Sequence, residues 1–160
     1  MRKSLLGAAA AAALLLPGSA LAQSGTIKIG ILVALEGAFA TGGQDGVRNV
    51  ELALKQVNNT IAGKKIELVV ADHQNKADVA AAKAREWFDT NGVDLLIGGT
   101  NSATALAMAK VPSEKKKPFL VVGAASSALT NDQCTPYTVH WAYDTVALGK
   151  GTGGAVVKAG

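Results

Sequence analysis

Two short segments of the 160-residue sequence combine small residues with neutral hydrogen-bond donors. The first reads GGTNSA over residues 98–103, and the second reads GAASS over residues 123–127. Free backbone N–H groups and the helix dipole make the start of a helix favourable for an anion, and small residues let a ligand reach the main chain. Together the two segments are suited to hold a carboxylate without a positive side chain.

Ser102 in the first segment also has a purely structural interpretation. Serine is a frequent cap at the start of a helix, and GAASS is also typical of an ordinary turn. The residues by themselves leave the two interpretations open.

The pair Asp72-His73 suggests metal binding or acid–base chemistry. No second His lies nearby in the sequence, so a polar strand end is the favoured interpretation. His140, between Val139 and Trp141, is expected to be packed or exposed rather than catalytic. No G-x-S-x-G motif occurs, which removes the commonest hydrolase signature. We therefore predict no catalytic residue and no metal ligand.

The segment GKGTGG over residues 149–154 matches the G-x-G-x-x-G pattern of dinucleotide-binding turns. It lies several residues beyond a strand instead of directly at its end, so no dinucleotide and no other cofactor is predicted. The basic run KKK at residues 115–117 is typical of a solvated turn. The formal charge of +4 falls to +2 without Arg2 and Lys3, which gives no reason to expect nucleic acid as a partner.

Residues 1–22 have the three parts of a secretory signal peptide. MRK is a positive start, residues 5–16 form an apolar run, and Ala20-Leu21-Ala22 supplies small residues for cleavage before Gln23. The apolar run is shorter than the roughly 20 residues that span a bilayer, so a membrane anchor is the less favoured alternative. We expect a periplasmic mature chain of residues 23–160.

The spacing of apolar residues predicts alternating strands and helices. Strands are expected at residues 27–35, 66–71, 93–97, 119–122 and 138–141, and helices at 47–61, 77–89 and 102–111. The third helix is expected to stop before Pro112, because proline restricts the residue that precedes it. Beyond residue 144 the assignment stays open, because Val146, Val156 and Val157 allow a helix while the glycines among them oppose it.

This alternation predicts an α/β fold, an open parallel sheet with helices on both faces. In such sheets ligands bind outside the carboxyl ends of the strands. The candidate binding loops are therefore residues 35–43, 72–76, 98–103 and 123–127.

Five segments of the chain carry a family resemblance: IKIGI at 27–31, EGA at 36–38, VADHQN at 70–75, IG at 97–98 leading to Ser102, and GAASS at 123–127. In order and spacing they resemble the branched-chain amino-acid type of ABC-transporter substrate-binding protein, which has the type I periplasmic binding fold of the leucine-isoleucine-valine-binding protein. PYTVHW at 136–141 and YDT at 143–145 resemble a subgroup of which some members carry aromatic carboxylic acids. The resemblance covers essentially the whole chain after the signal.

The resemblance implies a two-lobed protein whose cleft closes over a small carboxylate ligand. The ligand-binding residues that it implies are Ser102, Ala103, Ala124, Ala125, Ser126 and Tyr143. Gly42 matches the position whose side chain covers the ligand in the family, and glycine has no side chain to do so.

The resemblance also implies a domain organisation. Residues 23–143 would form the N-terminal lobe, and residues 144–160 the crossover and the start of the first helix of a second lobe. Because family members are more than twice as long, the chain is expected to be a fragment, truncated before the second lobe, with half of the ligand clamp. The single Cys134 excludes a disulfide framework and a Cys-based zinc site within the chain.

The function that the resemblance implies is solute binding for an ABC importer. The full-length protein would deliver a small carboxylate, such as a branched-chain amino acid or an aromatic acid, to a membrane permease. A ligand sensor or amide-regulator protein of the same fold is the leading alternative. A small α/β enzyme that uses Asp72 and His73 is the alternative from another class.

Overall fold

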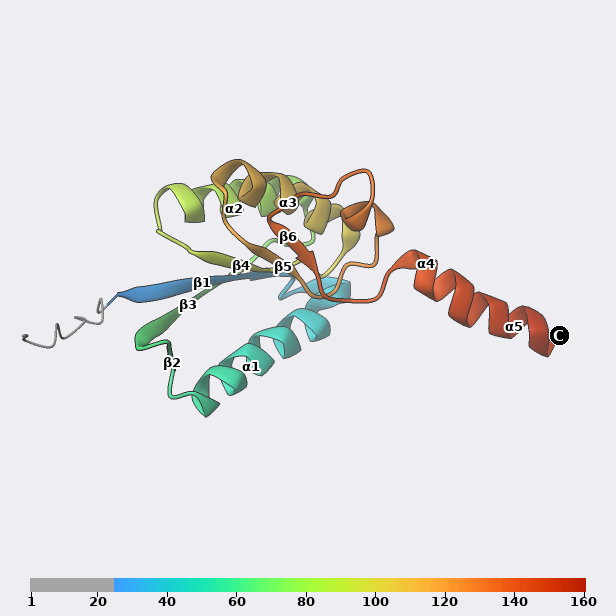
Figure 1. Cartoon of the computed structure of the whole chain (residues 1–160), viewed down its shortest axis with the longest axis horizontal. Coiled ribbons are helices and arrows are strands. Elements are labelled where there is room, and N and C mark those ends of the chain that lie inside the picture. The colour runs from blue at the N-terminus through green and yellow to red at the C-terminus, as the bar shows by residue number, and fades with distance from the viewer. Residues whose placement is uncertain (1–24) are drawn as a thin grey trace, which may run out of the picture.

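A computed structural model describes residues 25–160, so the predicted signal peptide lies outside the described residues (Figure 1). The chain forms a six-stranded sheet in the order β2-β3-β1-β4-β5-β6. The strands are β1 (Thr26–Val33), β2 (Thr60–Ile61), β3 (Lys64–Asp72), β4 (Leu95–Gly98), β5 (Phe119–Val121) and β6 (Thr138–His140). All neighbours pair in parallel except β2 and β3, which are antiparallel. The α/β class is confirmed, and β2 makes the sheet mixed.

Helices cover the two faces of this sheet unequally (Figure 1). Helices α2 (Ala77–Asp89) and α3 (Ser102–Lys115) pack on one face, whereas α1 (Ala40–Gln56) is the one helix among residues 25–160 that packs on the other. The larger core cluster joins α2 and α3 to residues such as Leu32, Leu96 and Phe119. The smaller cluster joins Leu54 of α1 to strand residues such as Ile29.

The apolar character of both sides of β1 explains its central place. Ile29, Ile31 and Val33 face α1, while Leu32 belongs to the cluster with α2 and α3. Gly30 also faces α2, where a Cβ atom would lie 2.6 Å from the Trp87 ring. The Trp87 ring can therefore pack directly against β1, because Gly30 has no side chain.

Three predicted helix boundaries are wrong. Helix α1 begins at Ala40, seven residues before its predicted start, and includes Gly42 and Gly43. Helix α3 continues through Pro112 to Lys115, and Pro112 is fully buried. Because proline lacks an N–H group, the helix loses one hydrogen bond there, and packing of the ring in the core offsets the loss. Helix α1 ends at Gln56 instead of running to Ile61, since the chain turns there and Ile61 joins the short strand β2.

The C-terminal segment, left open by the sequence, is helical throughout. A helix α4 (Thr145–Leu148), a π-helical turn η3 (Gly149–Gly153) and a helix α5 (Gly154–Ala159) follow one another and project away from the sheet (Figure 1). The Asp144 side chain caps the start by accepting a hydrogen bond from the Ala147 N–H at 2.7 Å. The G-x-G-x-x-G segment thus lies inside a helix and forms no strand-to-helix turn.

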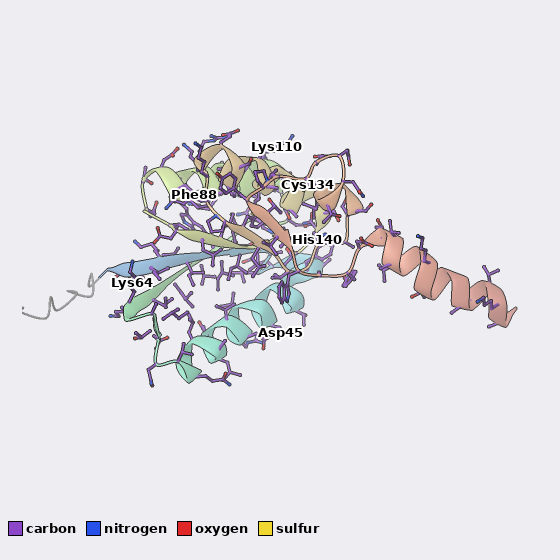
Figure 2. All side chains as sticks on the ribbon, viewed as in Figure 1. Asp45, Lys64, Phe88, Lys110, Cys134 and His140 are labelled. Carbon is purple, nitrogen blue, oxygen red and sulfur yellow. The ribbon has the colours of Figure 1, made fainter. Side chains whose placement is uncertain are left out.

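The side chains of the C-terminal helix extend into open space, as Figure 2 shows, and Val157 is 83% exposed. Cys134, in the loop before β6, is an exposed free thiol. Within residues 25–160, no helix has the length and apolar character needed to cross a membrane.

Candidate ligand-binding site

The order of the strands places the candidate site at the carboxyl ends of β1 and β4. Within the sheet, β3 lies next to β1 on one side and β4 lies next to β1 on the other. The chain therefore leaves β1 in one direction to form β3 and then crosses back to form β4. The loops that leave β1 and β4 therefore diverge. Crevices of this kind are where open α/β sheets bind ligands.

The two serines expected to hold a carboxylate lie together at this edge. The Ser126 N–H donates a hydrogen bond to Ser102 Oγ at 3.2 Å, and Ser126 Oγ accepts one from the Ala128 N–H at 3.3 Å. Both side chains are half-buried. Each hydroxyl oxygen accepts a hydrogen bond in these contacts, so each keeps its own hydrogen for donation. The convergence of the two loops, on which the predicted site depends, is present in the structure.

The cap of helix α3 is Asn101, so the purely structural interpretation of Ser102 as the cap is wrong. Asn101 Oδ1 accepts a hydrogen bond from the Thr104 N–H at 3.0 Å, and the Asn101 carbonyl accepts one from the Ala105 N–H at 3.0 Å. The first N–H groups of a helix have no partner within the helix. The Ser102 and Ala103 N–H groups thus remain available at the positive end of the helix dipole.

The carbonyl groups of the second loop are engaged within the protein. The Ala124 carbonyl lies 2.6 Å from His140 Nε2, and the Ala125 carbonyl accepts a hydrogen bond from the Thr145 N–H at 2.7 Å. A carbonyl oxygen repels a carboxylate, so its engagement elsewhere favours an anion at this loop. His140 is half-buried and holds the loop, which agrees with a packing role rather than a catalytic one.

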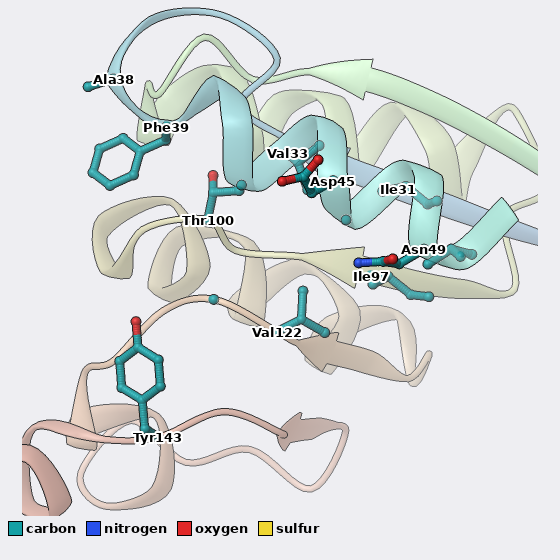
Figure 3. Close-up of a pocket in the computed structure, with 14 residues that line it drawn as sticks. Ile31, Val33, Ala38, Phe39, Asp45, Asn49, Ile97, Thr100, Val122 and Tyr143 are labelled. Carbon is teal, nitrogen blue, oxygen red and sulfur yellow. The ribbon is translucent and has the colours of Figure 1, made fainter. Parts of the chain in front are cut away.

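A cavity of about 560 Å³ extends from this edge beneath α1. Tyr143 is the one predicted ligand-binding residue that lines it, while Thr100 and Gly123 connect it to the loops that carry Ser102 and Ala124. Figure 3 shows Phe39, Thr100 and Tyr143 around one end of the cavity, with apolar side chains of the sheet along its length. The predicted anion site and the cavity are thus neighbours and not the same surface.

Phe39 was missed in the sequence interpretation. It ends the short helical turn η1 (Gly37–Phe39), lines the cavity and is 42% exposed. Gly42, the expected covering position, lines the same cavity without a side chain. The available signal was an aromatic residue three positions before Gly42 in the sequence, since an aromatic side chain can cover a ligand and glycine cannot.

Asp72 and His73 lie where β3 ends and a turn begins. Asp72 Oδ1 accepts a hydrogen bond from the Gln74 N–H at 2.6 Å, and His73 is fully buried. Burial lowers the pKa of the His73 imidazole, and the nearby charge of Asp72 opposes that shift. Among residues 25–160, no group of three His, Cys, Asp or Glu side chains is placed to hold a metal ion.

The sequence of residues 26–160 matches the family model described as periplasmic binding protein. This chain belongs to that family. A Leu/Ile/Val-binding protein homolog of Brucella melitensis is 31% identical over 133 residues, which are 82% of this chain and 32% of the relative. The chain spans about a third of the length of the curated relatives it matches.

Solved structures of periplasmic binding proteins resemble the chain in fold. A periplasmic binding protein of Burkholderia mallei has a TM-score of 0.81 and 56% identity, over 84% of this chain and 36% of that protein. A Rhodopseudomonas palustris solute-binding protein, solved in complex with benzoate, has a TM-score of 0.80 and 27% identity over 84% and 38% of the two chains. The predicted family and fold are therefore confirmed. The matched family and the neighbours described above are periplasmic or solute-binding proteins and not enzymes, so they give no support to the alternative of an enzyme that uses Asp72 and His73.

Proposed function

We propose that the chain supplies the N-terminal ligand-binding lobe of an extracytoplasmic solute-binding protein for an ABC importer. Residues 23–143 form this lobe, and residues 144–160 form the crossover to a second lobe. The signal peptide of residues 1–22 directs it to the periplasm, and a membrane permease receives the ligand. The family membership and the solute-binding neighbours support this role.

The ligand of this lobe is a small carboxylate. The observation that carries the proposal is the hydrogen bond from the Ser126 N–H to Ser102 Oγ, which brings the loop of Ser126 to the start of helix α3. Ala103, Ala124 and Ala125 complete the main chain around them. No cationic side chain lines the adjacent cavity, so neutral donors provide the attraction for the anion.

An aromatic acid is a better candidate than an aliphatic amino acid. Phe39 and Tyr143 border the cavity, and aromatic side chains pack favourably against an aromatic ligand. An amino acid also needs a partner for its ammonium group. Asp45, the one acidic residue that lines the cavity, already pairs with Arg48 at 2.6 Å. Two Rhodopseudomonas palustris neighbours, solved with benzoate and with 3,4-dihydroxybenzoic acid, also support an aromatic acid.

Nuclear magnetic resonance of the nitrogen-labelled chain tests this proposal, because it detects millimolar binding by a single lobe. We expect benzoate to shift the amide signals of Ser102, Ala103 and Ser126, and L-leucine to shift them less. Ser102→Ala removes one hydroxyl donor and should weaken benzoate binding about tenfold. Ser113→Ala, at the other end of α3, is the matched control and should leave binding unchanged. Amide shifts confined to other parts of the chain would contradict the proposed site.

A further inference from the structure

Thr100 lies two residues after the end of β4 and contacts the end of β1 across the crevice. Its Oγ1 accepts a hydrogen bond from the Ala34 N–H at 3.2 Å, although 66 residues separate the two in sequence. The side chain is half-buried and lines the cavity. Its hydroxyl lies at the same end of the cavity as Phe39 and Tyr143 (Figure 3). Thr100 therefore stands at the point where the strand order places a ligand.

The contacts of His73 determine which of its ring nitrogens carries hydrogen. His73 Nδ1 lies 3.0 Å from the Asn75 backbone N–H, which is always a donor. Nδ1 must therefore accept, and the hydrogen of the neutral ring is on Nε2. His73 Nε2 lies 3.1 Å from Thr100 Oγ1, so Nε2–H donates to that oxygen.

With these two hydrogen bonds in place, the Thr100 hydroxyl can still donate a hydrogen bond but cannot accept another. Its oxygen has two lone pairs, and both accept hydrogen bonds, from the Ala34 N–H and from His73 Nε2–H. Neither partner can accept the hydroxyl's own hydrogen. The hydroxyl is thus a donor only, and the space open to it is the cavity.

The neighbouring loops hold this arrangement in place. The His73 N–H donates to the Val33 carbonyl at 3.0 Å, which fixes the end of β3 beside β1. The Asn101 side-chain amide donates to Asn75 Oδ1 and so links the loops that follow β3 and β4. Because the ring is fully buried between these loops, its orientation is determined by packing as well as by hydrogen bonds.

We propose that Thr100 is a further ligand-binding residue, whose hydroxyl donates a hydrogen bond to an acceptor atom of the bound carboxylate, and that His73 is the positioning residue that makes it a donor. This inference rests on the proposed carboxylate-binding function and adds a donor from the cavity to those of Ser102 and Ser126. It also gives a role to a buried histidine that the anion site itself does not use.

The protonated nitrogen of His73 is directly measurable. Long-range proton–nitrogen NMR spectra of the whole chain near neutral pH distinguish the two neutral forms of a histidine ring. We expect the His73 signals to show hydrogen on Nε2. Hydrogen on Nδ1 would overturn the inference, because Thr100 would then donate to the ring and have nothing to offer a ligand.

Substitutions at residue 100 test the hydroxyl itself, with benzoate as the probe. Thr100→Val preserves the shape and removes the donor, and we expect benzoate binding to weaken about tenfold. Thr100→Ser restores the hydroxyl and should bind benzoate within about twofold of the natural chain. Equal binding by Thr100→Val and Thr100→Ser, in chains whose amide spectra show the native fold, would overturn the inference.

The Ser102→Ala variant separates this inference from the proposed function. If Ser102→Ala and Thr100→Val both weaken binding, both proposals are supported. If Ser102→Ala leaves benzoate binding unchanged while Thr100→Val weakens it, the proposed serine site is wrong and the proposed Thr100 donor is supported. If benzoate and L-leucine both fail to bind the natural chain, both proposals fall.

Discussion

The two faces of the sheet differ in how completely they are covered. Neighbouring residues of β5 and the loop after it show this, because successive side chains of a strand point to opposite faces. Val121, on the face of α2 and α3, is fully buried, whereas Val122, on the face of α1, is 41% exposed. Further along the α1 face, Val139 is 50% exposed and Trp141 is 76% exposed. The face covered by two helices is sealed, and the face covered by one is open beyond β4.

The difference separates the part of the lobe that stabilises the fold from the part that offers a binding surface. The sealed face holds the larger core, with Phe119 and Met108 fully buried. The open face contains the 560 Å³ cavity, which α1 covers along one side. Burial of apolar surface stabilises the fold roughly in proportion to the area removed from water. Most of the stabilising burial therefore lies on the face away from the cavity.

The largest expected effect is the loss of a side chain from the sealed face. Phe119→Ala should lower the free energy of unfolding by about 3–5 kcal/mol, because it leaves a cavity in a packed core. Leu120→Ala, next to it on β5 but facing the open side, should cost less than about 2 kcal/mol, because Leu120 is only half-buried. Urea unfolding followed by circular dichroism measures both. Equal losses would show that the two faces contribute alike.

The sequence predicts much of this architecture because its signals are local. The alternation in residues 27–35 and the helical spacing in 77–89 correspond to β1 and α2, with ends shifted by a residue or two. The strand β2 gave no such signal, since two residues at a hairpin have no periodicity. The predicted end of helix α3 before Pro112 is wrong for a physical reason. Proline locally disfavours a helix, and burial of its ring in the core overrides that preference.

Acid should destabilise the lobe through its buried histidine. His73 is fully buried, whereas His140 on the edge strand β6 is half-buried. Burial lowers the pKa of His73, so the unfolded chain, whose ordinary value is about 6.5, takes up a proton before the folded chain does. The contribution of His73 to stability is thus fully present above about pH 6.5 and is lost as the pH falls below that value.

The measurement is the free energy of unfolding between about pH 7 and pH 5, in the natural chain and in His73→Gln. We expect stability to fall toward pH 5 in the natural chain and to fall less in His73→Gln, which has no titrating ring at that position. His140 and the carboxyl groups are common to both chains and cancel in the comparison. Parallel pH profiles would show that His73 titrates alike in the folded and unfolded chains.

The candidate site could be predicted from the sequence only in part. Ser102 and Ser126 come from loops that follow strands of the same sheet, and the rule for parallel strands brings their ends to one edge. The Thr100 donor depends on a contact with His73, 27 residues away, and on which ring nitrogen accepts the Asn75 N–H. No spacing rule in a sequence encodes such a contact, because it is set by how the loops pack.

The smallest expected effect is on the open face. Val139→Thr keeps the shape of the side chain and adds a hydroxyl that water can reach, since Val139 is half exposed on β6. We expect the free energy of unfolding to change by less than about 0.5 kcal/mol. The matched variant on the sealed face is Val121→Thr, which buries a hydroxyl among apolar side chains and should cost about 1–3 kcal/mol. Urea unfolding of the two variants compares them directly. A loss at Val139 as large as that at Val121 would mean that the α1 face is covered in solution, and the cavity beneath α1 would then be closed to a ligand.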